Sequence, residues 1–330
     1  LGTLYEDRSD YERAIAAYKR ALEINDRAFK VGFALARLYL RKGGMEAEAL
    51  ALYRDVVKRS PDEEVVLDAA QRATDLAEYL GTLGELERDL APLVFLYAQK
   101  TVYRKVLVRT IERQVPRLVA RTRAPGGDAE ASAELARIGE HGLKPLLEAL
   151  TDGDDNERRT AVATLGYLGN KSAAPALVRF VMDSGKPRPE VPADSYVVLD
   201  AAPDMALRVE ALVAAGRLGD ERTVADLSIL LTDKESAIKE AAAWALGMTR
   251  SSKAIAPLTK ALTSDPRPQV RMYACVSLGA LGDKKALPAV LAAARDAQRG
   301  ADVQAACGFA LGLLGDTSAP TLEVLGALLA

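Results

Sequence analysis

The apolar and polar positions over the C-terminal two thirds of the chain form a repeat. From Asp128 onward, a basic residue is followed three positions later by alanine, then by a small residue with Leu-Gly, and finally by a second Leu-Gly. The copies span residues 158–169, 208–219, 239–250, 271–282 and 304–315, and the third ends in arginine instead of glycine. A degenerate earlier copy ends at Gly139. A pattern that recurs at this interval indicates a helical repeat protein.

The end of each copy predicts where one helix stops and the next begins. Glycine after leucine ends the first helix because it adopts a left-handed backbone at no steric cost. A second helix then opens with proline, whose missing N–H would lack a partner in a first helical turn anyway. These prolines are Pro145, Pro175, Pro257, Pro288 and Pro320. One hairpin cannot bury its own apolar face, so we expect an all-α fold, a right-handed α-solenoid of stacked helical hairpins.

Residues 128–330 resemble the short HEAT-like repeats of the phycobilin-lyase type, which serve many roles. The deoxyhypusine hydroxylase relatives bind iron through paired His-Glu motifs on successive repeats. This chain has one histidine, His141, followed by Gly142, which excludes that activity, and we expect His141 to be a turn residue. The lyase relatives attach bilins, and no residue of this chain specifies that chemistry. The resemblance therefore implies a solenoid, without a cofactor.

The N-terminal residues carry a different helical pattern. Ala14 and Ala49 lie 35 positions apart, and each is followed four positions later by tyrosine, at Tyr18 and Tyr53. The other positions are Gly2, Tyr5 and Ala21 in the first copy and Ala36, Tyr39 and Pro61 in the second. These residues resemble tetratricopeptide repeats, in which small residues let paired helices approach and tyrosines fill the gaps between them.

The patterns divide the chain into segments. We expect tetratricopeptide-like repeats over 1–62, a degenerate helical repeat with a long connecting helix over 63–123, and a HEAT-like array over 128–330 with an insertion at about 184–204. Residues 63–80 read as one helix, and 85–122 as a single long or broken helix that Pro116 should end or kink. Residues 124–127, Ala-Pro-Gly-Gly, read as a linker. Because this linker is short, we expect the two arrays to stack end to end.

Composition and charge narrow the choice of function. Apolar residues make up 49% of the chain and aromatic residues only 5%, so packing must rely on alanine, leucine and valine. The net charge of −2 argues against a surface that binds nucleic acid or anionic lipid as a whole. The chain has no apolar run of the length that spans a membrane, and we expect a cytoplasmic protein. It begins at Leu1 inside a repeat pattern, which suggests a fragment that has lost any targeting segment.

The residue types that usually carry catalysis or bind metals are scarce. Cys275 and Cys307 fall on predicted buried helix faces one repeat apart, and we expect two small core residues instead of a disulfide. Trp244 lies beside alanines in mid-helix, and we expect it in the core. With one histidine and two separated cysteines, a catalytic triad or a zinc site lacks its residues. We therefore expect no enzyme, no metal and no catalytic residue.

A basic row is the sharpest charge feature of the chain. Its members lie four residues apart on one helical face and are Lys105, Arg109, Arg113, Arg117 and Arg121. Like charges at this spacing repel one another, so an anion should offset them. That anion is either a partner, such as nucleic acid, phospholipid or an acidic peptide, or acids of the chain itself. The candidate acids are Glu130, Glu134, Asp152, Asp154, Asp155 and Glu157. We favour the intramolecular acids and keep the row as a candidate anion site.

The second helices of the array supply candidate residues for binding a partner. In solenoids of this kind, we expect these helices to line the concave face. Their exposed positions carry Glu148, Arg179, Lys260, Arg295 and Glu323, a mixed polar set that suits a protein or peptide. The insertion holds a short apolar stretch at residues 196–199, which either docks on the solenoid or contacts a partner.

We therefore expect a non-catalytic scaffold or adaptor that binds a protein or peptide along its solenoid surface. Two alternatives stay open: a module that binds anions or nucleic acid through the basic row, and an accessory subunit of a lyase-like modifying enzyme.

Overall fold

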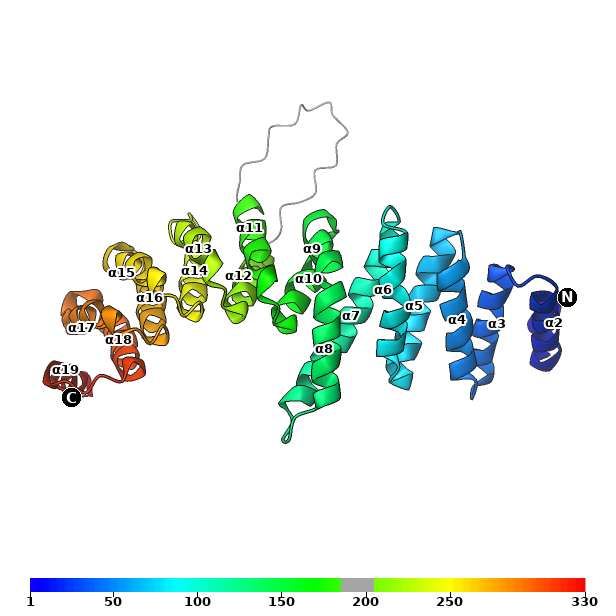
Figure 1. The fold of residues 1–330 in the computed structure, drawn as a ribbon, viewed down its shortest axis with the longest axis horizontal. Coiled ribbons are helices and arrows are strands. Elements are labelled where there is room, and N and C mark those ends of the chain that lie inside the picture. The colour runs from blue at the N-terminus through cyan, green and yellow to red at the C-terminus, as the bar shows by residue number, and fades with distance from the viewer. Residues whose placement is uncertain (185–204, 330) are drawn as a thin grey trace, which may run out of the picture. The chain divides into compact units, whose positions relative to one another are not determined.

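The computed structural model describes residues 1–184 and 205–329, and every regular element in these ranges is a helix (Figure 1). The chain divides into two compact units, Leu1–Ala149 and Leu150–Ala330. We call them the first unit and the second unit. The expected all-α solenoid of stacked hairpins is confirmed.

The first unit is a series of antiparallel helices, each packed against the next. Its helices are α1 (Gly2–Asp7), α2 (Tyr11–Ile24), α3 (Phe29–Lys42), α4 (Glu46–Arg59), α5 (Glu63–Leu80), α6 (Leu83–Leu96), α7 (Thr101–Arg123) and α8 (Ala129–His141), and α9 (Leu143–Asp152) follows at its end. The small and aromatic residues of the tetratricopeptide pattern are buried: Ala14 and Ala49 are fully covered, and Tyr18 and Tyr53 lie beside them in the core. These residues set the spacing of the helices, as the pattern predicts.

The connecting region is a broken helix instead of a single long one. The break lies at residues 97–100, between α6 and α7, whereas α7 runs without interruption through Pro116. The expectation that Pro116 ends this helix is therefore wrong, and a kink at Pro116 stays a prediction. Pro116 lies on the exposed side of α7, where water can bond the carbonyl group that loses its N–H partner.

Helix α8 belongs to the first unit, although the sequence pattern placed it with the second array. It packs against α7 and buries Ala131 and Ile138. Residues 124–127 form the turn between the two helices, and Arg121 spans that turn to reach Asp128 at 2.7 Å. Gly139 does not end a helix, because α8 continues to His141.

The second unit alternates a first helix, a tight turn and a second helix. The first helices are α10 (Asp155–Leu168), α12 (Met205–Leu218), α14 (Ser236–Met248), α16 (Pro268–Ala280) and α18 (Ala301–Leu314). The second helices are α11 (Ala174–Ser184), α13 (Val224–Leu230), α15 (Ile255–Ser264), α17 (Leu287–Arg295) and α19 (Ala319–Leu329). Short 3-10 turns precede or link them at Lys171–Ala173, Glu221–Thr223, Ser252–Ala254, Lys284–Ala286 and Ala297–Arg299. The insertion predicted at about 184–204 lies, beyond Ser184, outside the described residues.

The residues that close each repeat adopt the left-handed backbone that the pattern predicts. Gly169, Gly219, Gly282 and Gly315 have φ between 61° and 71°. Arg250, which stands where the pattern expects glycine, has a φ of 53°. The turn therefore imposes its geometry on arginine too, in a region that costs a non-glycine residue roughly 1–2 kcal/mol.

The first helices pack closely because glycine recurs at one position. A Cβ atom added at Gly247 would lie 2.9 Å from the Cα of Ser277, and one at Gly279 would lie 2.7 Å from the Cα of Ala310. The same position is glycine at Gly166 and Gly216. The second helices, by contrast, hardly touch one another. Because the layer with the shorter spacing lies inside a bend, the second unit curves toward its first helices (Figure 1).

We call the first helices of the second unit the inner helices and its second helices the outer helices. This arrangement corrects the expectation that the second helices line the concave face.

Opposite effects are expected when alanine replaces two glycines at this repeat position. Gly279→Ala should destabilise the second unit by about 1–3 kcal/mol, because the new methyl group meets the backbone of α18. Gly312 stands at the same position on α18, and an added Cβ there has no neighbour within 4 Å. Gly312→Ala should therefore stabilise the unit by about 0.5–1 kcal/mol through helix propensity. Urea unfolding followed by Trp244 fluorescence measures both, and stabilisation by Gly279→Ala would contradict the packing argument.

The two cysteines form a disulfide, which corrects the expectation of two separate core thiols. Cys275 on α16 and Cys307 on α18 are fully buried and joined, with 5.3 Å between their Cα atoms. Gly279 lies where α16 and α18 approach each other closely. This approach brings the two cysteines within bonding distance.

Candidate functional site

The inner helices of the second unit present one face to the inside of the bend. Positions on an inner helix are counted from the basic residue that opens each copy of the repeat. Positions −2, +1, +2, +5 and +9 lie within about 100° of one another around the helix axis. In the part of the unit that the structure describes, the side chains at these positions are exposed or half-buried, with Ala241 as the exception. We call this surface the inner face.

On α14, α16 and α18, the inner face is apolar. Tyr273 is 43% exposed, Phe309 60% and Leu313 46%, and what distinguishes them from single exposed apolar residues is that they share one face of neighbouring inner helices. The complete set, which we call the apolar patch, is Trp244, Met248, Met272, Tyr273, Val276, Phe309 and Leu313. The patch crosses three consecutive helices without a charged side chain at its centre.

Trp244 is half-buried at the edge of this patch, not enclosed in the core as expected. Its indole ring lies against Gly216 on the neighbouring α12, so one side of the ring packs and the other contributes to the inner face. The tryptophan thus acts as both a packing residue and a surface residue.

The charged residues of the inner face are three acids and two arginines, and one of the arginines, Arg159, lies near the N-terminal end of α10. Glu210, Glu240 and Asp302 lie near the N-terminal ends of α12, α14 and α18. Arg217 lies near the C-terminal end of α12, with its guanidinium 5.6 Å from the centre of the Tyr167 ring. On α14 and α18, Glu240 and Asp302 therefore border one end of the apolar patch, where the helix dipoles also favour negative charge.

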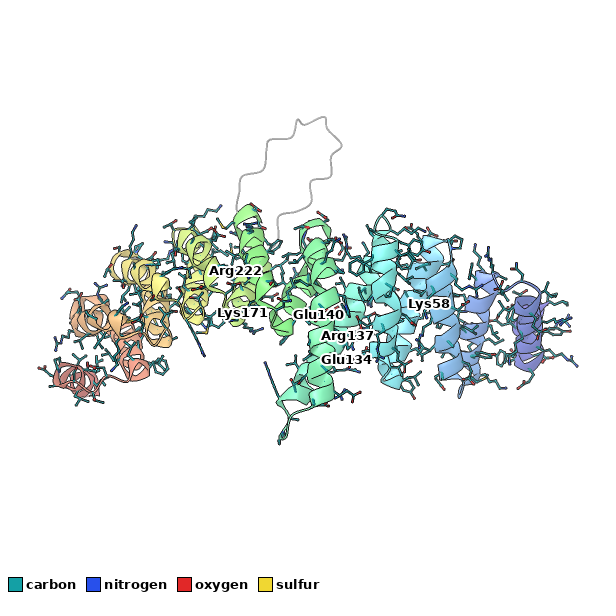
Figure 2. All side chains as sticks on the ribbon, viewed as in Figure 1. Lys58, Glu134, Arg137, Glu140, Lys171 and Arg222 are labelled. Carbon is teal, nitrogen blue, oxygen red and sulfur yellow. A yellow bond between two sulfur atoms is a disulfide. The ribbon has the colours of Figure 1, made fainter. Side chains whose placement is uncertain are left out.

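The turns between inner and outer helices hold their own charges in place. At the turn before α13, the Nε of Arg222 donates to Asp220 at 2.9 Å. The hydrogen bonds from Arg222 keep the pKa of the Asp220 carboxyl below its ordinary value, and Lys171 adds to this effect. Lys171 and Arg222 belong to successive turns (Figure 2). The side chain of Arg222 is therefore held by Asp220 within the same turn.

Four of the five binding residues proposed from the sequence lie on the outer helices of the second unit, and Glu148 lies on α9 in the first unit. Arg179 and Lys260 are exposed on α11 and α15, and Glu148 on α9 lies 3.8 Å from Lys144. Arg295 and Glu323 are brought together as a pair at 3.6 Å between α17 and α19. A shallow hollow of about 580 Å³ between α15 and the next turn includes Lys260. Their role in binding stays a prediction.

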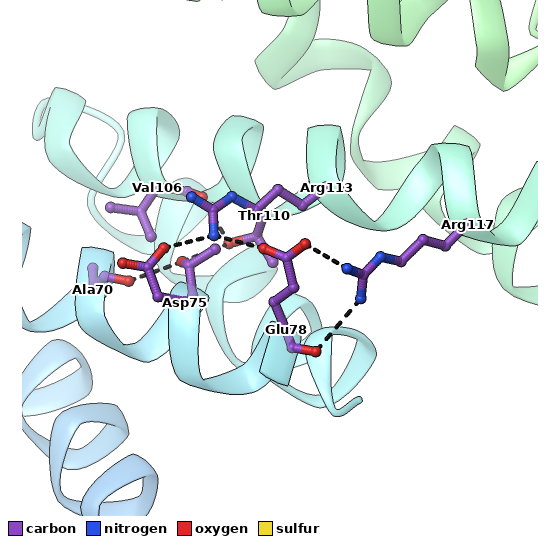
Figure 3. A network of polar contacts seen from close by, with 8 residues as sticks. Ala70, Asp75, Glu78, Val106, Thr110, Arg113 and Arg117 are labelled. Atoms are coloured by element: carbon purple, nitrogen blue, oxygen red, sulfur yellow. Dashed lines mark hydrogen bonds and ion pairs between the residues drawn. The ribbon is translucent and has the colours of Figure 1, made fainter. Parts of the chain in front are cut away.

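The basic row on α7 is partly neutralised by acids of α5. The Nη1 of Arg113 lies 2.6 Å from Asp75 and 2.7 Å from Glu78, and Arg117 reaches Glu78 at 2.5 Å (Figure 3). Burial alone would lower the pKa of Arg113, but its hydrogen bonds and charge interactions with Asp75 and Glu78 raise it. Glu78 forms ion pairs with both arginines, so this part of the row is held against α5.

The remaining members of the row have different surroundings. Arg121 pairs with Asp128 at 2.7 Å and lies 3.7 Å from Glu130; Glu130 is one of the acids that the sequence suggested. Lys105 is half-buried and Arg109 is exposed. Arg113, Arg117 and Arg121 thus have acids of the chain beside them, and the row as an anion site stays a prediction.

A buried ion cluster joins α6 to α8 in the first unit. Glu87 is fully buried, and Arg137 Nη2 lies 2.5 Å from its carboxylate. His141 Nε2 lies 3.2 Å from Arg137 and 4.0 Å from Glu87, and Glu134 accepts a hydrogen bond from Gln114 at 2.8 Å. Glu134 and Arg137 lie close together on α8 (Figure 2). His141 is the last residue of that helix, where a turn residue was expected, and the cluster binds the helices to one another.

Sequence reasoning missed the apolar patch although its signal was available. The positions five and nine after the opening basic residue hold Val276, Phe309 and Leu313. These residues can be recognised as exposed only when it is known which side of each first helix is covered by its neighbours. The glycine contacts between the helices show which side that is.

Among residues 1–184 and 205–329, every helix lacks the combination of length and hydropathy that crossing a bilayer requires. Within the same ranges, no three histidine, cysteine, aspartate or glutamate side chains are arranged to hold a metal ion.

Solved structures with helical repeats resemble the chain at low identity. Kap121p shares 17% identity at a TM-score of 0.48, covering 96% of this chain and 35% of that one. An engineered protein shares 16% at 0.46, covering 87% and 82%. The CpcE–CpcF complex of phycocyanin lyase from Nostoc sp. PCC7120 shares 18% at 0.36, covering 84% and 94%. No curated protein matches the sequence, and we draw no functional conclusion from the structural similarities.

Family models agree with the two patterns in the sequence. The model described as HEAT repeats matches residues 197–271 and 255–330, and tetratricopeptide repeat models match residues 1–27 and 31–63. The chain is therefore a helical repeat protein that carries tetratricopeptide repeats at its N-terminus, followed by HEAT repeats.

Proposed function

We propose that the chain is a non-catalytic scaffold that binds a protein partner on the inner face of its HEAT repeats. The observation that carries this proposal is the apolar patch on α14, α16 and α18. Large exposed apolar side chains that adjoin one another mark interaction surfaces in soluble proteins. Tyrosine, tryptophan, phenylalanine and methionine, the residue types of this patch, are those enriched in protein interfaces.

The repeat fold supports the same proposal on energetic grounds. Helices α14 and α16 each pack between two other inner helices, and α18 packs against α16, α17 and α19, so the exposed side chains are positioned before a partner arrives. A preorganised surface loses less conformational entropy on binding. The aromatic members of the patch are the residue types that most often dominate binding energy.

The alternatives have less support. Binding of nucleic acid or another anion by the basic row competes with the ion pairs of Arg113, Arg117 and Arg121. For a role as an accessory subunit of a modifying enzyme, no feature of the described residues provides a specific argument.

Removal of two aromatic side chains should separate this proposal from the one drawn from the sequence. In the double variant Tyr273→Ala/Phe309→Ala, we expect capture of a bound partner from cell extract to fall at least tenfold. Each truncation of an aromatic anchor typically costs about 2 kcal/mol or more of binding energy. Both side chains are exposed, so circular dichroism should show an unchanged helical fold. Quantitative mass spectrometry of the captured proteins is the measurement.

The outer surface supplies the matched control. Arg179→Glu/Lys260→Glu changes two residues on outer helices and should leave capture unchanged. Loss of the partner in this control, with full retention in the aromatic variant, would transfer the binding role to the residues chosen from the sequence and refute the proposal.

A further inference from the structure

The acids on the inner face are a second feature beside the apolar patch. Glu210, Glu240 and Asp302 are exposed or half-buried. None of their carboxylates forms a hydrogen bond or ion pair with another residue that the structure describes. Two carboxylates near the ends of the inner helices differ: Asp265 pairs with Lys239 at 2.6 Å, and Asp233 lies 3.5 Å from Arg208. The carboxylates of the inner-face acids are therefore available to a partner.

The position of these acids relative to the apolar patch is set by the repeat. Asp302 lies seven residues before Phe309 on α18, and Glu240 lies four residues before Trp244 on α14. At 1.5 Å per residue, the acids stand roughly 6–11 Å along the helix axis from the aromatic side chains. On the inner face of α14, α16 and α18, the positions that define this face carry no basic residue. The patch thus has an acidic border on the side of the helix N-termini.

We infer that the partner presents an amphipathic protein segment whose apolar side chains cover the patch and whose basic side chains meet Glu240 and Asp302. This inference rests on the proposed function and adds the chemistry of the partner. Complementary charge at the border of an apolar contact selects the partner and fixes its direction. A nucleic acid fits this surface poorly, because its phosphates would meet carboxylates instead of arginines and lysines.

The size of the surface limits the length of the segment. The patch spans three adjacent helices, and helix axes in contact lie about 8–10 Å apart. A helical segment of roughly 15 residues extends over this width. A phage-displayed library of random 15-residue peptides is therefore a suitable probe.

The experiment selects peptides on the full chain and discards those that also bind Tyr273→Ala/Phe309→Ala. We expect the remaining peptides to combine apolar residues with lysine or arginine. For the strongest of them, fluorescence anisotropy should show a Kd about tenfold higher on Glu240→Lys/Asp302→Lys. The same selection carried out on that variant should yield peptides rich in aspartate and glutamate.

A control with the same change of charge tests whether position matters. Glu221→Lys/Glu323→Lys alters two exposed acids outside the inner face and should leave the Kd of the selected peptide within about twofold. Both variants are checked by circular dichroism.

The outcomes separate the two proposals. If selection yields acidic or uncharged peptides, or if labelled oligo-dT displaces them, the chemistry inferred here is overturned while the inner face stays the binding surface. If no peptide distinguishes the chain from Tyr273→Ala/Phe309→Ala, and partner capture is also unaffected by that variant, the proposed function itself fails.

Discussion

Reduction of the Cys275–Cys307 disulfide is expected to lower the free energy of unfolding of the second unit by about 4 kcal/mol. The two cysteines are separated by 32 residues, and closing a loop of that size restricts the unfolded chain by about this amount. Both side chains are fully buried, so the loss should show as weaker stability of an otherwise unchanged fold. Urea unfolding with and without dithiothreitol measures it. Trp244, the single tryptophan, lies in this unit and reports it by fluorescence.

Removal of both sulfur atoms provides the control for this prediction. Cys275→Ala/Cys307→Ala should unfold at a lower urea concentration than the oxidised chain and should not respond to dithiothreitol. Two free thiols in the denatured, unreduced protein would contradict the disulfide itself. The same thiol measurement on protein from its native cell tests the expected cytoplasmic location, because disulfides persist mainly in oxidising compartments.

Replacement of Arg137 by methionine is expected to destabilise the first unit by about 3 kcal/mol. The substitution leaves the carboxylate of Glu87 fully buried without the guanidinium that lies 2.5 Å from it. Loss of one partner of a buried pair typically costs about 3–5 kcal/mol, and the partial exposure of Arg137 favours the lower end. Because Trp244 lies in the other unit, hydrogen exchange of amides in α6 and α8 is the suitable measurement.

A double variant distinguishes the buried charge from lost packing. Glu87→Leu/Arg137→Met removes both charges and keeps apolar volume, and such replacements are often neutral. We expect its amide protection to return to within about 1 kcal/mol of the original chain. Equal destabilisation in the single and double variants would mean that the contacts of the arginine stem, and not the unpaired carboxylate, explain the effect.

Repeat architecture follows directly from the sequence, because its determinants are local. Glycine at Gly169 and Gly282 ends a helix wherever a left-handed residue is required, and the same turn holds Arg250 when glycine is absent. The spacing of Ala14 and Ala49 places small residues where tetratricopeptide helices meet. Such signals depend on a few neighbouring residues, so the sequence by itself determined the all-helical fold, its repeats and most of its helix ends.

Contacts between repeats were decided only by the tertiary structure. Arg113 and Arg117 of the basic row proved to be held by acids of α5, because helix packing brings Glu78 to Arg113 across 35 residues. Cys275 and Cys307 could be recognised as a bonded pair only once the approach of α16 to α18 was known.

The binding surface depended on the direction in which the second unit bends. That direction follows from the spacing between neighbouring helices. The sequence shows which positions are glycine, but it does not show which residue of a neighbouring helix each glycine contacts. Periodicity shows which residues of a helix are apolar, but the packing of the neighbouring helices determines which of those residues stay exposed. For this reason the sequence could supply Tyr273 and Phe309 as apolar residues, and only the folded second unit could place them on its inner face.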